Sequence, residues 1–179
     1  ASHPSSTIDS GLANAQNTYT SHYYAVAGPK DPSGFYAVDS GNNGGYATDG
    51  PMYLDSRIRF EDITDGTSNT FVLGEIAMPK APSGYRAEGG DGASWVRGIM
   101  WNGTTASKNG NSSAKNVFFS VNAVPAVVEF NNTPFSSMHP GGANFAKCDG
   151  SIAFVQEDVD INVYRATASI AKEEMQVIK

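Results

Sequence analysis

The chain has no long hydrophobic run. None of its apolar stretches approaches the roughly 18 residues that a membrane-spanning helix requires. It also has no segment with a charged start and an apolar centre, which is the pattern of a secretory leader. We therefore expect this chain by itself to stay out of the membrane.

Basic residues are few. The 12 lysines and arginines are outnumbered by 18 aspartates and glutamates, so the formal net charge is −6. A protein that binds the phosphate backbone needs a basic patch, and these residues form no cluster. We expect no nucleic-acid partner.

Cysteine is nearly absent as well. Cys148 stands alone, so the chain cannot form an internal disulfide. A single free thiol usually behaves as a small buried hydrophobe, and we expect that of Cys148. The three histidines are too widely spaced to predict a zinc site.

Common catalytic motifs are missing, among them G-x-S-x-G, H-E-x-x-H and a glycine-rich phosphate loop. His139 and Asp149 could in principle form an acid–base pair. A strand between them would place Asp149 roughly 15 Å from the start of that strand, and His139 lies before the start. We predict structural roles for both residues, no catalysis and no required cofactor.

Turn-forming residues, in contrast, are abundant. The 19 glycines and the many Asn, Ser and Thr residues are typical of short strands joined by turns. A length of 179 residues suits one domain with a sizeable core. We predict one α+β, β-rich domain over residues 1–179, with an antiparallel sheet, short helices and a polar lead-in segment at 1–17.

Apolar and alternating runs predict the strands. They lie at 22–27, 35–38, 57–60, 70–76, 94–101, 117–121 and 126–130. The run at 70–76 has the composition of a central strand.

A hairpin follows these runs, because Asp149-Gly150 is the strongest turn signal in the chain. With those two residues as the loop, Phe145 would face Phe154, and both rings would be buried on one side. Cys148 would then lie on the opposite face, among small residues.

The flanks of the hairpin complete a unit over residues 135–169. Pro140, Gly141 and Gly142 predict a loop before the first strand. After the second strand, Asp158 or Asp160 is expected to cap a short helix that reaches Ala168, because a carboxylate satisfies free N–H groups at a helix start.

A cluster of turn residues at 62–70 admits two interpretations. Asp62, Asp65 and Asn69 offer the oxygen ligands that Ca²⁺ prefers. Helix capping and Asx turns explain the same residues almost as well. Glu75, inside an apolar strand, needs a partner. Three arginines could supply a salt bridge: Arg57, Arg59 and Arg97.

Both clusters carry a family resemblance. His139, nine residues and then Asp149-Gly150, within H-P-G-G-A-N-F…D-G-S-I-A-F, resemble the carboxyl-terminal H-x9-D-G signature of the DUF1559 family, pilin-like proteins abundant in planctomycetes. The block D-I-T-D-G-T-S-N-T, continuing to Gly74-Glu75, resembles a second block of the same family. The motif positions are His139, Pro140, Gly141, Gly142, Asn144, Asp149 and Gly150, and Asp65, Gly66, Ser68, Asn69 and Glu75.

The resemblance implies a pilin-like globular head and a non-catalytic role, similar to that of a pseudopilin, in the cell envelope or outside the cell. Family members begin with a prepilin-type leader and a long apolar helix, which this chain lacks. Self-association, or contact with other pilin-like subunits, would use that helix. The chain also departs from the family at Lys147-Cys148 and in its ending at 170–175.

A second function, from another class, stays open. The chain could be an extracellular module that holds a small solute or glycan in its Gly/Asn-rich loops, near Tyr46, Tyr53, Tyr85 and Trp101. A binder requires an aromatic-lined cleft with convergent polar groups, whereas an assembly head requires flat contact surfaces.

Overall fold

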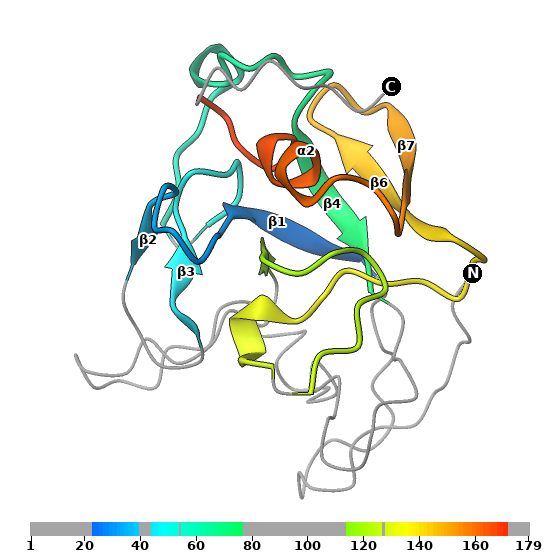
Figure 1. Cartoon of the computed structure of the whole chain (residues 1–179). Helices are drawn as coiled ribbons and strands as arrows, with labels where there is room; N and C mark the ends of the chain where they lie inside the picture. Colours follow the sequence, from blue (N-terminus) through cyan, green and yellow to red (C-terminus); the bar gives the residue numbers. More distant parts are fainter. Residues whose placement is uncertain (1–22, 40–43, 54, 77–113, 127, 172–179) are drawn as a thin grey trace, which may run out of the picture.

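The computed structural model describes residues 23–39, 44–53, 55–76, 114–126 and 128–171, and the structural statements below refer to these ranges. Most of their regular structure is β-strand, arranged in one five-stranded sheet and one two-stranded ladder (Figure 1). Within these ranges no helix combines the length and apolar character needed to cross a membrane.

The main sheet has the strand order β5-β1-β4-β6-β7. Its strands are β1 (Tyr23–Pro29), β4 (Phe71–Glu75), β5 (Ala114–Val117), β6 (Gly142–Lys147) and β7 (Ile152–Gln156). The ladder pairs β2 (Val38–Asp39) with β3 (Tyr46–Ala47). The helical segments are η2 (Phe60–Asp62), η4 (Phe130–Asn132) and α2 (Ile161–Ala166).

The strongest strand predictions are confirmed. β1 and β4 coincide with the runs at 22–27 and 70–76, and β4 is the central strand of the sheet. The predicted antiparallel arrangement is wrong in one pairing, because β5 runs parallel to β1. Alternation of side chains carries no information on strand direction, so the mixed character of the sheet could not be read from it.

Two other predicted strands do not form. Residues 57–60 lead into η2 instead, because the Asp62 carboxylate accepts the backbone N–H of Arg59 at 2.8 Å and closes a helical turn. Residues 126–130 lead into η4, and β5 lies before most of the run at 117–121. The predicted strand at 94–101 and the segment 1–17 lie outside the described residues.

The β6–β7 hairpin forms with a register one residue different from the prediction. Its loop has three residues, Cys148, Asp149 and Gly150, and Gly150 N–H donates to the Lys147 carbonyl at 2.9 Å. Gly150 has a φ of +86°, whereas Asp149 does not enter the positive-φ region. The loop is therefore a turn followed by a left-handed glycine, not the predicted two-residue turn.

The additional loop residue moves Phe154 to the other face of the sheet. Phe145 pairs with Ala153 and is buried, whereas Phe154 pairs with Asn144 and is 45% exposed. Ile152 is 68% exposed. The predicted core pair of Phe145 and Phe154 is therefore wrong, because a slip of one residue reverses every side chain of a strand.

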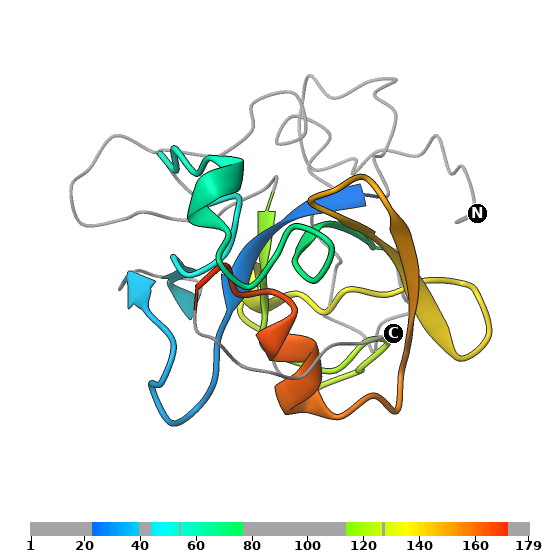
Figure 2. The ribbon, with the colours of Figure 1, turned by 90° about the horizontal axis from the view of Figure 1, so that it is seen from above.

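The core lies between the inner face of the sheet and α2, which covers that face (Figure 2). The ring of Tyr164 in α2 lies 5.6 Å from that of Phe145 and 6.4 Å from that of Phe71, centroid to centroid. Asp160 caps α2 as predicted, with its carboxylate accepting the Asn162 N–H at 2.7 Å. The helix ends at Ala166 and is shorter than predicted.

The opposite side of the sheet is defined here as the outer face. A β-bulge between Phe71 and Leu73 turns Phe71 into the core and Leu73 toward solvent. Strand pairing then places Leu73, Ala146 and Ile152 in one row across β4, β6 and β7. The neighbouring row holds Tyr23, Glu75, Asn144 and Phe154.

Candidate functional site at the junction of the two motifs

The two motif clusters meet at Glu75. This last residue of β4 belongs to the outer face, yet it is only 5% exposed. A buried carboxylate is costly unless donors satisfy its oxygens, so the partners of Glu75 define the site.

Both carboxylate oxygens of Glu75 have partners, and these come from different segments. Oε2 accepts the backbone N–H and the side-chain amide of Asn144, at 2.7 and 3.1 Å. Oε1 accepts the Tyr23 hydroxyl at 3.3 Å and lies 3.6 Å from Nε2 of His139. The carboxylate thus ties together β1, β4, β6 and the loop before β6.

The predicted salt bridge from Glu75 is not formed by Arg57 or Arg59. Arg59 instead pairs with Glu61 at 3.0 Å on the surface, Arg57 is exposed, and Arg97 lies outside the described residues. Two partners of Glu75 lie on the adjacent strands. Which residues these are depends on strand register, and the register was not predicted correctly.

Within the cluster, the electrostatics favour a neutral phenol at Tyr23. Burial and then the charge of Glu75 raise the pKa of Tyr23 above its ordinary value, so this hydroxyl remains a donor at neutral pH. His139 lies on the solvent side of the cluster, with its side chain 37% exposed, and the contact with Glu75 is an ion pair only when the imidazole is protonated.

The loop before β6 positions His139. Gly141 has a φ of +81°, and its carbonyl accepts the Glu157 N–H at 2.9 Å. The backbone N–H of His139 donates to Ser137 Oγ at 2.8 Å. Pro140 is exposed between them. The Pro-Gly-Gly turn therefore fixes the direction in which the imidazole leaves the chain.

The hairpin loop provides a second contact between the motifs. The N–H of Cys148 donates to the Thr70 carbonyl at 2.8 Å, and the N–H of Asp149 donates to the Thr67 carbonyl at 3.1 Å. The Asp149 carboxylate accepts both the N–H and the hydroxyl of Ser151, at 2.9 and 2.6 Å. Asp149 thus holds the turn, while the 65–70 block receives it.

The segment after α2 closes the same block from the other side. The N–H of Phe71 donates to the Thr167 carbonyl at 2.8 Å, and the Thr70 hydroxyl donates to the Ser169 carbonyl at 3.2 Å. The motif residues consequently join three parts of the chain that are distant in sequence.

Two motif glycines lie directly beneath aromatic rings. A Cβ on Gly74 would lie 2.4 Å from a ring carbon of Phe145 and 2.5 Å from one of Phe135. A Cβ on Gly142 would lie 2.8 Å from the ring of Phe154. A side chain at either position would push a ring away from the strand, which explains why glycine is required there.

The 62–69 block is an ordered turn. Gly66 has a φ of +95°, and its carbonyl accepts the Asn69 N–H at 2.9 Å. The Asn69 amide donates to the Asp65 carbonyl at 3.0 Å, and Ser68 is exposed. In the described part of the chain, no three His, Cys, Asp or Glu side chains group closely enough to hold a metal ion. Capping explains the contacts of Asp62, and calcium binding stays a prediction that a chelator titration would test.

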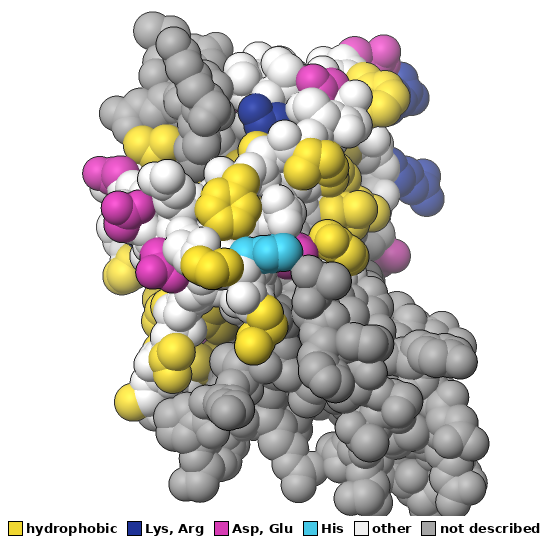
Figure 3. Space-filling view, turned by 90° about the vertical axis from the view of Figure 1, so that its right-hand side faces the viewer, with side chains coloured by type: hydrophobic (Ala, Val, Ile, Leu, Met, Phe, Trp, Pro, Cys, Tyr) yellow, Lys and Arg dark blue, Asp and Glu magenta, His cyan; other side chains and the backbone are white. Residues whose placement is uncertain are grey.

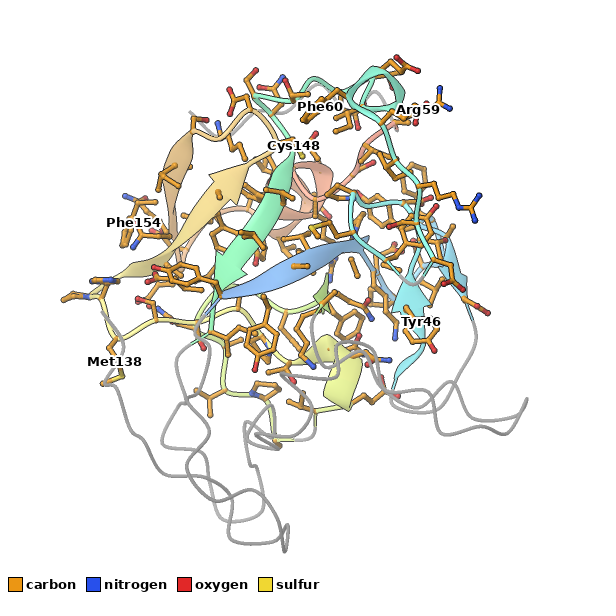
Figure 4. The ribbon with its side chains drawn as sticks, turned by 180° about the vertical axis from the view of Figure 1, so that it is seen from behind. Tyr46, Arg59, Phe60, Met138, Cys148 and Phe154 are labelled. Atoms are coloured by element: carbon orange, nitrogen blue, oxygen red, sulfur yellow. The ribbon has the colours of Figure 1, made fainter. Side chains whose placement is uncertain are left out.

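Cys148 lies in the hairpin loop rather than on a strand face, and it is half-buried (Figure 4). Burial and then the charge of Asp149 raise its pKa to about 11. The thiol therefore remains protonated at neutral pH and is a poor nucleophile.

The aromatic residues predicted for ligand binding are not gathered in an open site within the described ranges. Tyr46 is a core residue of β3, only 2% exposed (Figure 4). Tyr53 packs against the small cluster of Ala25, Ala27 and Ala114. Tyr85 and Trp101 lie outside the described residues.

A second polar network, which the sequence analysis missed, holds β3 and η4 against β5. The Asn116 side chain accepts the Ala47 N–H at 2.9 Å and donates to the Gly45 carbonyl at 3.1 Å. It also donates to Asn132 Oδ1 at 2.8 Å, and Asn131 donates to the same Gly45 carbonyl at 2.8 Å. The signal in the sequence was an asparagine directly before the apolar run at 117–121.

Tyr23 and Asn144 were also missed as partners of Glu75. Asn144 was recognised as a motif position but without a role, and Tyr23 only as part of a strand. Both occupy outward positions of strands beside β4, so a correct register would have identified them.

Comparison with known families gives one match. A family model described as a protein of unknown function (DUF1559) matches residues 2–162. A search of curated proteins gave no match, and neither did a search of solved structures.

Proposed function

Because the chain belongs to the DUF1559 family, we propose that it is a non-catalytic, pilin-like structural or assembly protein of the cell envelope, displayed outside the cell. The observation that carries the proposal is the outer face of the sheet, which presents apolar side chains to solvent. A surface of this kind suits contact with another macromolecule better than it suits chemistry on a small substrate.

The exposed apolar residues of this side surround the Glu75 site. They are Tyr23, Leu73, Met138, Ile152 and Phe154. In the space-filling view, hydrophobic side chains lie on several sides of a histidine (Figure 3). Soluble monomers rarely expose such residues in groups, so the grouping supports a role in assembly.

The chemistry of the motif residues also supports a structural role. A catalytic carboxylate needs an oxygen free to take a proton or bind a substrate. The oxygens of Glu75 already accept Asn144 and Tyr23 and face His139. Using Glu75 as a base would break the contacts that hold the motif residues together.

In this proposal the described residues form the globular head of a longer protein. The family resemblance implies an apolar N-terminal helix that would anchor the protein and contact other pilin-like subunits. The solute- or glycan-binding alternative receives no support from Tyr46, because the buried ring cannot stack on a ligand.

The proposal is tested by locating the full gene product in its native cells. An antibody against this domain should label the cell envelope or surface filaments, and the product should sediment with that fraction. A freely secreted or cytoplasmic product without an apolar helix would contradict the proposal. Hydrolysis of any substrate that depends on His139 would contradict it as well.

A further inference from the structure

The edge strand β7 has backbone N–H groups for which the described residues provide no acceptor. Lys147 N–H donates to the Ser151 carbonyl, and Glu157 N–H donates to the Gly141 carbonyl. These two bonds show which opposed residues of the hairpin form hydrogen-bonded pairs. Because bonded and non-bonded pairs alternate in an antiparallel ladder, the odd-numbered residues of β7 bond to β6. The N–H groups of Ile152, Phe154 and Gln156 point outward, and nothing in the described part of the chain accepts them.

The side chains of β7 leave this edge unprotected. Natural edge strands usually carry a charge, a proline or a bulge that prevents pairing with another chain. The sequence of β7, Ile-Ala-Phe-Val-Gln, has none of these. Ile152 and Phe154 add exposed apolar surface beside the free backbone groups. Only another extended strand can satisfy both features together.

The other edge of the sheet is not available for the same pairing. β5 is buried at all four of its positions and lies against β3 and η4. A second copy of the chain could therefore not add its β5 to an exposed β7. Two copies can meet edge to edge only through β7 and β7, which gives a closed two-fold pair rather than an open fibre.

We propose that β7 pairs antiparallel with β7 of a second copy of this chain, with the two Phe154 residues opposite each other. This inference deepens the proposed assembly role by naming the partner of its exposed edge. Ile152 then faces Gln156 of the partner copy, and all outward N–H groups of both strands obtain acceptors. The two phenylalanine rings become neighbours on a continuous outer face, an arrangement that favours pairing.

The charges around β7 disfavour one alternative register. A register shifted by one residue, centred on Ala153, would place Asp149 opposite Glu157 of the other copy, which costs energy because the charges are alike. The register centred on Phe154 places Glu157 opposite Ser151 instead. With a net charge of −6 per chain, the pairing should strengthen as salt screens the remaining repulsion.

Sedimentation velocity of the isolated chain at increasing concentration tests the proposal. The wild type should show weak, reversible dimerisation that increases with salt, because a single edge pairing is a small interface. Phe154→Lys should weaken the dimer by about tenfold or more, since it places two like charges together. Phe60→Lys is the matched control, because Phe60 is also exposed but belongs to η2 rather than to the sheet (Figure 4).

Cross-linking provides a second measurement that does not depend on affinity. In a Cys148→Ser background, Phe154→Cys should form a disulfide dimer much faster than Phe60→Cys, because opposed Cα atoms of a bonded pair lie about 5.5 Å apart. Equal rates, a monomeric wild type at about 1 mM, or equal loss from both lysine variants would each overturn the pairing. Native filaments with a monomeric isolated chain would overturn the pairing and leave the proposed function standing.

Discussion

The two edges of the main sheet are built in opposite ways. β5 is buried at every position and held by the amide network of Asn116, Asn131 and Asn132. It also carries Lys115, which is only 1% exposed and lies over the ring of Tyr24 at 5.6 Å. β7 has no charged residue, and its side chains are mostly exposed.

This difference indicates that the β5 edge is closed to pairing with a second chain and that the β7 edge is available for it. An inward-pointing charge on an edge strand discourages pairing with a second chain, because the partner strand would have to accommodate it. β5 has such a charge and a cover of asparagines as well. β7 has neither, although Asn144 of the neighbouring strand β6 is held by Glu75.

The largest expected loss of stability comes from neutralising Glu75, which supports the sheet on the β7 side. Glu75→Gln places an amide where Asn144 and Tyr23 donate, so at least one donor loses its acceptor. We expect a loss of about 3 kcal/mol in the free energy of unfolding, measured by urea denaturation. Glu61→Gln, at an exposed pair, is the control and should change stability by less than about 0.5 kcal/mol. Equal effects would show that Glu75 does not anchor this side.

Uncovering the β5 edge should have a smaller effect on stability. Asn116→Ala leaves the Ala47 N–H without its acceptor, while the Gly45 carbonyl keeps the Asn131 amide as its donor, and we expect a loss of about 2 kcal/mol. The variant should also self-associate more than the wild type, since β5 becomes accessible. Asn162→Ala, at an exposed position of α2, is the control. An Asn116 variant with unchanged stability would mean that the amide network is not what closes this edge.

The smallest expected effect is the dependence of folding stability on pH that Lys115 causes. Burial lowers the pKa of Lys115 from 10.5 to about 7, so between these values the unfolded chain binds a proton that the folded chain does not. The stability of the folded state therefore rises with pH in this interval, by about 1 kcal/mol between pH 7 and pH 8. Lys115→Met should lack that rise. Parallel pH profiles for the two proteins would contradict the burial of the ammonium group.

Local signals in the sequence predicted part of this architecture. The apolar run of β4, the loop at Pro140 and the cap at Asp160 depend on residues close together in the chain, and each was located correctly. The hairpin was recognised, but its loop length was not. The third loop residue, Cys148, is held by the Thr70 carbonyl, a contact between distant segments that turn preferences do not include.

The candidate site was predicted in its components but not in its assembly. Glu75 was identified as needing a partner, and His139 as a loop residue, yet their contact was not foreseen. Tyr23, Asn144 and Glu75 come together only through the register of three strands. A one-residue error in that register moved Phe154 into the predicted core and removed it from the predicted surface.

Amide hydrogen exchange, followed by NMR at several protein concentrations, tests the central contrast most directly. The amides of Ile152 and Phe154 should exchange rapidly in dilute solution and become protected as the concentration rises, whereas the amides of β5 should be protected throughout. Protection of Ile152 and Phe154 in dilute solution would show that β7 is already covered. Fast exchange at every concentration would show that no second copy pairs with it.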